Sequence, residues 1–379
     1  MAFSFSEEQE EFRSVLRRYF QDHSPPTEVR RLMASDAGWE REGWQKLNQD
    51  LGLAGVHIPE EFGGQGFGFV ELGIVLEEMG RALVCAPYFA TTAMAASAIL
   101  NAGDDAARRR LLPPIATGEC IATLALKEPE SDWSPESTTM TAAPDGDGHA
   151  RLNGRKCFVL DGAQADLILL AARAPGSAGL EGLTLYAVAG DAPGLTRQPL
   201  AVMDPTRKQA DLELKDVAAE AVGPVGAAGP ALARTLDQIV TCLASEMVGG
   251  AESLRESALD YARMRMQFGR PIASFQVIKH KAADMLVDVE LARSAAYYAA
   301  DAAAQDSAEM PAVACLAKAS AAEAYIQTAI HAVQMHGGIG FTWDNDTHLW
   351  FKRAKSSEVL FGSAAWHRER MMQRWEMPA

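Results

Sequence analysis

The first part of the chain has apolar residues at the period of an α-helix. Five of them lie at the spacings i, i+3, i+4, i+7 and i+8, on one helical face: Phe12, Val15, Leu16, Tyr19 and Phe20. Ser6 and Gln9 precede them in the pattern of a capping box. Further helices are predicted over residues 40–51, 69–82, 89–102 and 104–117, the last broken around Pro113-Pro114. We therefore expect an N-terminal helical domain over residues 1–118.

The hydrophobic period then shortens to that of β-strands. Seven short apolar or alternating runs follow, at residues 120–126, 138–143, 151–153, 156–160, 167–172, 183–188 and 210–214. Turn residues separate these runs, among them residues 144–148 (Pro-Asp-Gly-Asp-Gly) and the Asn153-Gly154 pair. The pattern predicts a middle β domain, built as a barrel or sandwich, over residues 119–222.

A helical period returns near residue 225 and continues to the end of the sequence. Four helices are predicted, at residues 227–264, 274–306, 311–336 and 346–375. Gly269, Arg270 and Pro271 interrupt the chain between the first two. We expect a C-terminal four-helix bundle over residues 223–379, and hence a mostly α fold with a middle β domain.

Composition narrows the classes of function. The chain has 379 residues, 48% of them hydrophobic, and carries a net charge of −15. This charge argues against a nucleic-acid partner, which requires a basic face. No apolar run has the length of a membrane span, and the acidic N-terminus resembles no signal or transit peptide. The five cysteines lie far apart and the histidines lack metal-ligand spacing, so we expect reduced thiols, no metal site and a cytoplasmic protein.

Two short motifs in the last third of the chain carry the strongest functional signal. The first contains Arg265 and Phe268, and the second contains Gln334, Gly337 and Gly338. An arginine offers a permanent charge and a planar fork to a pyrophosphate, and glycines let the backbone approach a cofactor closely. The two motifs resemble the Arg-x-x-Phe-Gly and Gln-x-x-Gly-Gly segments of the acyl-CoA dehydrogenase family. There the pair holds the dinucleotide end of FAD across a subunit interface.

The resemblance extends along most of the chain. Gln276 matches the family's glutamine at the start of the next helix, and residues 58–64 match its Pro-Glu-x-x-Gly-Gly loop. Residues 152–156 resemble the family's Asn-Gly-x-Lys hairpin, and Glu128-Pro129 its Thr-Glu-Pro segment. The resemblance also assigns Ser363 and Phe158 to the cofactor site. Phe158-Val159-Leu160 replaces the Trp-x-Thr that contacts the flavin ring, so we expect this ring to be held differently.

The resemblance implies a reaction, a cofactor and partners. A carboxylate removes the α-proton of an acyl-CoA thioester, and the β-hydride passes to FAD. Electrons then leave to an electron-transferring flavoprotein or a similar acceptor. The chain is expected to form a dimer or tetramer, with like chains or with another acyl-CoA dehydrogenase chain.

The residue expected to act as the base is missing. The family's usual glutamate aligns with Phe361, and the alternative position on the preceding helix aligns with Ile239. Neither side chain accepts a proton, so Glu358, Asp237 and Glu246 are the remaining candidates. Helical geometry predicts a solvated face for Asp237 and a packing or capping network for Glu246.

Three interpretations of the missing base stay open. The chain either uses an unconventional base of its own or is a non-catalytic subunit that completes the FAD site of a homologue. The third interpretation is a flavin-free scaffold. Relatives that degrade steroid side chains are assembled from two unlike chains, which makes a steroid or branched acyl-CoA the expected substrate class.

Overall fold

The structure is a computed structural model that describes residues 5–376. The chain folds into two compact units, each built from segments that are distant in sequence. The bundle unit comprises Met1–Arg31, Phe69–Val84 and Val240–Ala379, and the sheet unit comprises Leu32–Gly68 and Cys85–Ile239. The three-domain division expected from the sequence, with boundaries at residues 118 and 222, stays a prediction. Within residues 5–376 no helix has the length and apolar character needed to cross a bilayer.

The helices of the first 118 residues largely follow the apolar pattern. They are α1 (Glu7–His23), α2 (Pro26–Met33), α3 (Arg41–Leu51), α4 (Phe69–Ala82), α5 (Ser97–Ala102) and α6 (Asp105–Ala116). The predicted capping box is confirmed, because the Ser6 side chain and the Gln9 side chain each bond the other's backbone N–H.

One of these helices contains an unexpected π-helical stretch, and another continues through a predicted break. The segment expected as one helix over 89–102 begins with a π-helical stretch, η3 (Phe89–Ala96). α6 is not broken at its two prolines, which lie inside it at positions 113 and 114. They fall in its last turn, so their missing N–H groups leave only the carbonyls of Arg109 and Arg110 without an intrahelical donor, and the helix ends two residues later.

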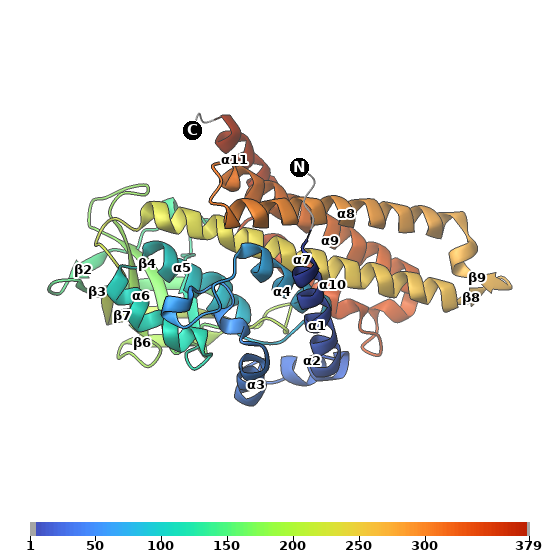
Figure 1. Ribbon diagram of the computed structural model, residues 1–379, viewed down its shortest axis with the longest axis horizontal. Helices are drawn as coiled ribbons and strands as arrows, with labels where there is room; N and C mark the ends of the chain where they lie inside the picture. Colours follow the sequence, from blue (N-terminus) through green and yellow to red (C-terminus); the bar gives the residue numbers. More distant parts are fainter. Residues whose placement is uncertain (1–4, 377–379) are drawn as a thin grey trace. The chain divides into compact units, whose positions relative to one another are not determined.

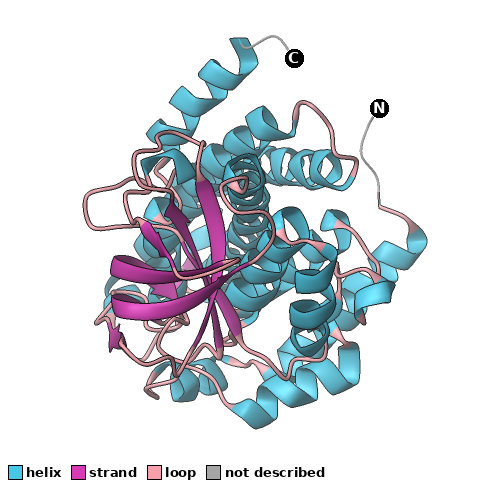
Figure 2. Ribbon diagram, turned by 90° about the vertical axis from the view of Figure 1, so that its left-hand side faces the viewer, coloured by secondary structure: helices cyan, strands magenta, loops and turns pink. Residues whose placement is uncertain are grey.

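A single mixed sheet forms the middle of the sheet unit (Figures 1 and 2). Its strands are β1 (Ala122–Ala125), β2 (Ala142–Pro144), β3 (His149–Leu160), β4 (Leu167–Arg173), β5 (Leu183–Ala189), β6 (Leu195–Pro199) and β7 (Gln209–Ala221). The order is β1-β4-β5-β7-β3-β2, with β6 also paired to β7. Inward residues such as Leu152, Ile168 and Leu212 are fully buried and form the core of this sheet.

The Asn153-Gly154 pair does not make the expected hairpin. β3 continues through it, because the long strand β7 pairs with β3 on both sides of the glycine. Register shifts between Leu152 and Gly154 and between Lys156 and Val159 mark bulges instead of a turn. A bulge places an extra residue in one strand and redirects the side chain at that point, which here affects Phe158.

Long helices form the bundle unit. They are α7 (Gly229–Met264), which begins in the sheet unit, α8 (Gln276–Ala304), α9 (Met310–His336), α10 (Thr347–Val359) and α11 (Ala364–Glu376). Figure 1 shows α8 and α9 as neighbouring long helices joined by a short loop. The helix predicted over 346–375 is two helices, α10 and α11. They are separated at Leu360–Ser363 because Phe361 and Gly362 both have positive φ angles, 57° and 108°.

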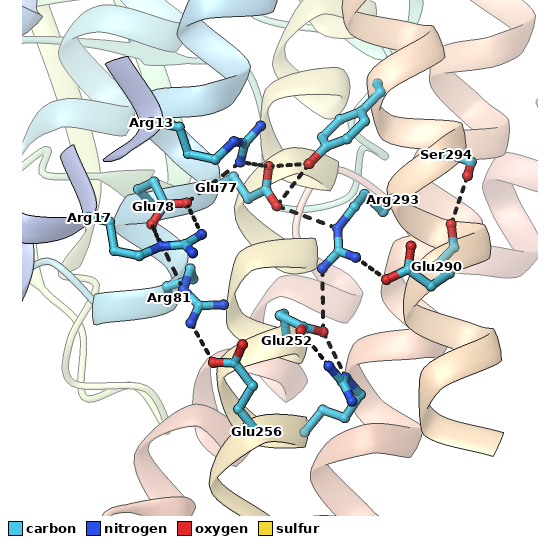
Figure 3. Close-up of polar contacts among 12 residues, drawn as sticks. Arg13, Arg17, Glu77, Glu78, Arg81, Glu252, Glu256, Glu290, Arg293 and Ser294 are labelled. Atoms are coloured by element: carbon cyan, nitrogen blue, oxygen red, sulfur yellow. Dashed lines mark hydrogen bonds and ion pairs between the residues drawn. The ribbon is translucent and has the colours of Figure 1, made fainter. Parts of the chain in front are cut away.

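A buried ionic network joins α1, α4, α7 and α8 within the bundle unit (Figure 3). The Glu77 carboxylate lies 2.6 Å from Arg13 and 3.6 Å from Arg293, and it accepts a 2.8 Å hydrogen bond from the Tyr297 hydroxyl. Burial and the adjacent Glu77 carboxylate raise the pKa of Tyr297, which keeps its hydroxyl a donor. Gly249 lets α7 approach this point, because a Cβ there would lie 1.8 Å from the Glu77 carbonyl oxygen.

Candidate active and cofactor site

Arg265 stands at the end of α7, beside a tight two-stranded hairpin. Strands β8 (Met266–Gln267) and β9 (Arg270–Pro271) pair through a turn at Phe268 and Gly269, whose φ angles are 52° and 76°. The Phe268 side chain is 91% exposed and Arg265 is also exposed. Gln276, the first residue of α8, is exposed as well.

The Gln334–Gly338 motif forms the end of α9. Gly337 ends this helix with φ 65° and ψ −142°, a conformation that suits glycine and strains other residues. A Cβ on Gly337 or Gly338 would meet no atom within 4 Å, so the backbone here faces open space. The exposed Gln334 accepts a 2.8 Å hydrogen bond from Lys281 through its side-chain oxygen.

The structure brings these two motifs to the same end of the bundle. The rings of Tyr261, four residues before Arg265, and His336, one residue before Gly337, stack with centroids 4.3 Å apart. The buried His336 ring is also bonded to the Ala332 carbonyl oxygen, at 2.8 Å. His336 therefore supports the junction of α7 and α9.

This junction fits one end of a dinucleotide. Within residues 5–376 no carboxylate pairs with Arg265, so its guanidinium is available to an anion. Arginine recognises phosphate oxygens with two parallel hydrogen bonds, and the open glycine backbone beside it allows close approach. Arg265, Phe268, Gln276, Gln334, Gly337 and Gly338 are thus chemically suited to the pyrophosphate end of FAD.

The loop between α10 and α11 carries Phe361, which is 1% exposed. Its carbonyl oxygen lies 3.0 Å from Nε2 of His367 on α11. Lys318 on α9, which is fully buried, donates to the carbonyl oxygens of Glu358 (3.2 Å) and Gly362 (3.1 Å). Ser363 is exposed and begins α11 by bonding the Trp366 and His367 N–H groups.

The sequence pattern does not predict that Lys318 and His367 contact the Phe361 loop. Burial lowers the pKa of Lys318 to about 7 and that of His367 to about 3. A signal for Lys318 exists in the sequence, because it is a single lysine within the alanine-rich segment 312–324. Its contacts with residues some 40 positions away could not be deduced from that pattern.

Two of the three candidate bases form ion pairs, and the third is buried in α7. Glu246 lies 2.5 Å from Arg353, and both side chains are buried. Glu358 pairs with Lys355 one helical turn away, at 2.6 Å. The expectation of a solvated face for Asp237 is wrong, because this residue is only 4% exposed. All α7 residues from 235 to 252 are buried, so the helix has no solvated face there. Ile239 is among them and is fully buried.

Two motifs of the sheet unit meet in one buried ion pair. Lys156, fully buried on β3, lies 2.7 Å from the Glu128 carboxylate, which also accepts a 2.8 Å hydrogen bond from the Thr139 N–H. The Lys156 ammonium and these hydrogen bonds lower the pKa of Glu128 despite its burial. Two residues beyond Lys156, the bulge gives Phe158 a φ of 55° and leaves it 45% exposed.

Comparison with known families identifies the chain. Three acyl-CoA dehydrogenase profiles match it in order: the N-terminal domain over residues 6–119, the middle domain over 123–217 and the C-terminal domain over 230–375. The chain belongs to the acyl-CoA dehydrogenase family. The expected fold, with helical, sheet and helical parts in that order, is confirmed.

Similar acyl-CoA dehydrogenases cover almost the whole chain. The acyl-CoA dehydrogenase IpdE2 of Mycobacterium tuberculosis is 34% identical over 98% of this chain and 99% of its own length. A chain in the solved structure of a variant of the Tcur3481-Tcur3483 steroid acyl-CoA dehydrogenase is 32% identical, with a TM-score of 0.87 over 97% of this chain and 98% of that chain. A chain of the Mycobacterium tuberculosis ChsE4-ChsE5 complex is 28% identical, with a TM-score of 0.89 over the full length of both.

Two regions of the bundle unit, the Arg265–Gly337 junction and the Phe361 loop, are now considered as parts of an acyl-CoA dehydrogenase. Members of this family are flavoenzymes, and FAD is the cofactor at the family level. Lys318 and Gly337 are 19 residues apart on α9, which corresponds to about 28 Å along its axis. The Arg265–Gly337 junction and the Phe361 loop therefore lie far apart along this helix.

Proposed function

We propose that this chain is an FAD-binding subunit that works with a second, unlike acyl-CoA dehydrogenase chain in the α,β-desaturation of an acyl-CoA. In this proposal the junction formed by Arg265, Phe268, Gln276, Gln334, Gly337 and Gly338 binds the ADP half of FAD held mainly by the partner. Gln276 and Phe268 flank the phosphate-binding groups, and Arg265 supplies the charge. Phe158 of the sheet unit and Ser363 of the bundle unit are each proposed as a contact of FAD.

The proposal rests on one observation, which is that the side chain at the family's base position in the Leu360–Ser363 loop cannot accept a proton. The side chain at the family's base position is that of Phe361, which is buried and has no proton-accepting atom. The alternative position, Ile239, is equally unsuited. Glu358, the only carboxylate within three residues of Phe361, is paired with Lys355. A base for the α-proton is therefore assigned to the partner chain.

The separation along α9 supports a shared cofactor. Because the Arg265–Gly337 junction and the Phe361 loop are about 28 Å apart along the helix, we assign them to different cofactor sites of an oligomer. When bound, FAD supplies the hydride acceptor, and this chain's residues supply phosphate recognition. An electron-transferring flavoprotein or similar acceptor then reoxidises the complex.

The substrate class follows from similarity to the relatives. The solved steroid acyl-CoA dehydrogenase resembles this chain over nearly its whole length. We therefore propose a bulky acyl-CoA, such as one with a steroid side chain, as the substrate of the assembled complex.

Co-expression tests this proposal. The chain is produced alone and together with a homologous chain that has glutamate at the position matching Phe361, and each preparation is analysed by light scattering and flavin absorbance. We expect a dimer or tetramer of unlike chains that contains FAD and desaturates acyl-CoA. A stable, flavin-replete monomer of the lone chain at micromolar concentration would exclude the shared site.

A further inference from the structure

Lys318 is an unusual residue for its position. It lies in the interior of α9 and is 0% exposed. Within residues 5–376 it donates to two backbone carbonyls and to no carboxylate. A buried ammonium or amine is costly unless its hydrogen bonds are satisfied. The two acceptors, Glu358 and Gly362, bracket Phe361 in the chain.

A second buried side chain holds the same loop from α11. His367 is 1% exposed, and its Nε2 lies 3.0 Å from the Phe361 carbonyl oxygen. That carbonyl is an acceptor only, so Nε2 carries the proton and donates it. Lys318 and His367 together bind three carbonyls, those of Glu358, Phe361 and Gly362.

The backbone of this loop needs such support. Phe361 has φ 57°, a left-handed conformation that strains a bulky residue. Gly362 follows with φ 108°, and a Cβ there would lie 2.4 Å from the Trp366 ring. The surrounding structure holds Phe361 in this conformation, and Lys318 and His367 contribute polar contacts to it.

We propose that Lys318 is a positioning residue that, with His367, fixes the backbone of residues 358–363. The loop takes its shape from these two donors, which lie outside it. The inference rests on the proposed function only in treating this loop as part of the acyl site. In this chain the loop at the family's base position is thus held by donors that lie outside the loop.

Hydrogen exchange of the loop amides, followed by mass spectrometry on the full chain, tests the inference. The N–H groups of Leu360, Gly362 and His367 all donate hydrogen bonds in or beside this loop. Lys318→Met keeps the length of the side chain and removes its donors. We expect exchange in the peptide covering residues 358–367 to become about tenfold faster or more, because buried acceptors lose their donor.

A matched control separates positioning from general loss of stability. Met285→Ala removes a fully buried side chain from α8, which makes no part of the loop. It should lower the melting temperature without selectively accelerating exchange at residues 358–367. Equal acceleration in the Lys318→Met and Met285→Ala proteins, or no acceleration in Lys318→Met, would overturn the inference.

His367→Phe gives an independent test if Lys318→Met does not fold. It removes the donor to the Phe361 carbonyl while keeping an aromatic ring on α11. We expect the same selective acceleration, and unchanged exchange in this variant would also overturn the inference. These measurements need neither flavin nor acyl-CoA, so their failure is distinguishable from failure of the proposed function.

Discussion

The Tyr261 ring stacks on the His336 imidazole with centroids 4.3 Å apart, and this contact joins two motifs about 65 residues apart in sequence. It places Arg265, which has no carboxylate partner within residues 5–376, at the same end of the bundle as Gly337 and Gly338. A charged group and an open glycine backbone together provide the features that phosphate recognition requires.

Arg265→Ala should therefore reduce the FAD content of the purified oligomer. Loss of a charge-assisted hydrogen bond costs about 1.5–3 kcal/mol, or roughly a ten- to hundredfold weaker affinity. Flavin absorbance per chain after gentle purification measures the effect. Arg263→Ala is the matched control, because Arg263 is an exposed arginine of the same helix that pairs with Asp260. Equal flavin content in the two variants would contradict the assignment of Arg265.

Glu246 should matter for stability, because it forms a buried pair with Arg353. Glu246→Ala removes the carboxylate that pairs with the buried Arg353, which we expect to lower the free energy of unfolding by about 3–5 kcal/mol. Glu358→Ala breaks a pair within one helix turn near the surface and should cost less than about 1 kcal/mol. Chemical denaturation of both variants checks this. If Glu246→Ala left stability unchanged and abolished activity, Glu246 would be a catalytic base.

Lys318 should make stability depend on pH in alkaline solution. Its pKa is about 7 in the folded chain and 10.5 without burial, so between these values the unfolded chain binds more protons than the folded one. Stability contributed by this residue therefore rises as pH increases from 7 towards 10. The melting temperature of the wild type relative to Lys318→Met should increase over this range. A difference that is constant or decreases with pH would show that Lys318 is not buried as an easily deprotonated amine.

The sequence predicts long, strongly periodic elements well. α1 and its capping box, and the helices α7, α8 and α9, follow from the apolar repeat and from the breaks at residues 269–271. The paired motifs at Arg265 and Gln334 suffice to indicate the family, because glycine and arginine have specific roles in binding a dinucleotide.

Features that depend on distant contacts could not be predicted in this way. The break between α10 and α11 requires Phe361 in a left-handed conformation, which Lys318 on α9 and His367 on α11 support. Asn153-Gly154 is typical of a turn, but pairing with β7 keeps it in a strand. Helical geometry alone predicts a solvated face for Asp237, but other elements cover that face of α7, and the sequence of one helix does not show which elements pack against it.

The central claim is that this chain has no base of its own and depends on a partner chain for deprotonation. The most direct test mixes the chain, supplied with FAD but without a partner chain and without oxygen, with straight-chain and steroid side-chain acyl-CoAs. Absorbance of the oxidised flavin is followed. A positioned base contributes about 10²–10⁴ in rate, so we expect slow or no bleaching by the lone chain and faster bleaching with the partner added or with Phe361→Glu. Rapid bleaching by the lone wild-type chain would contradict the account.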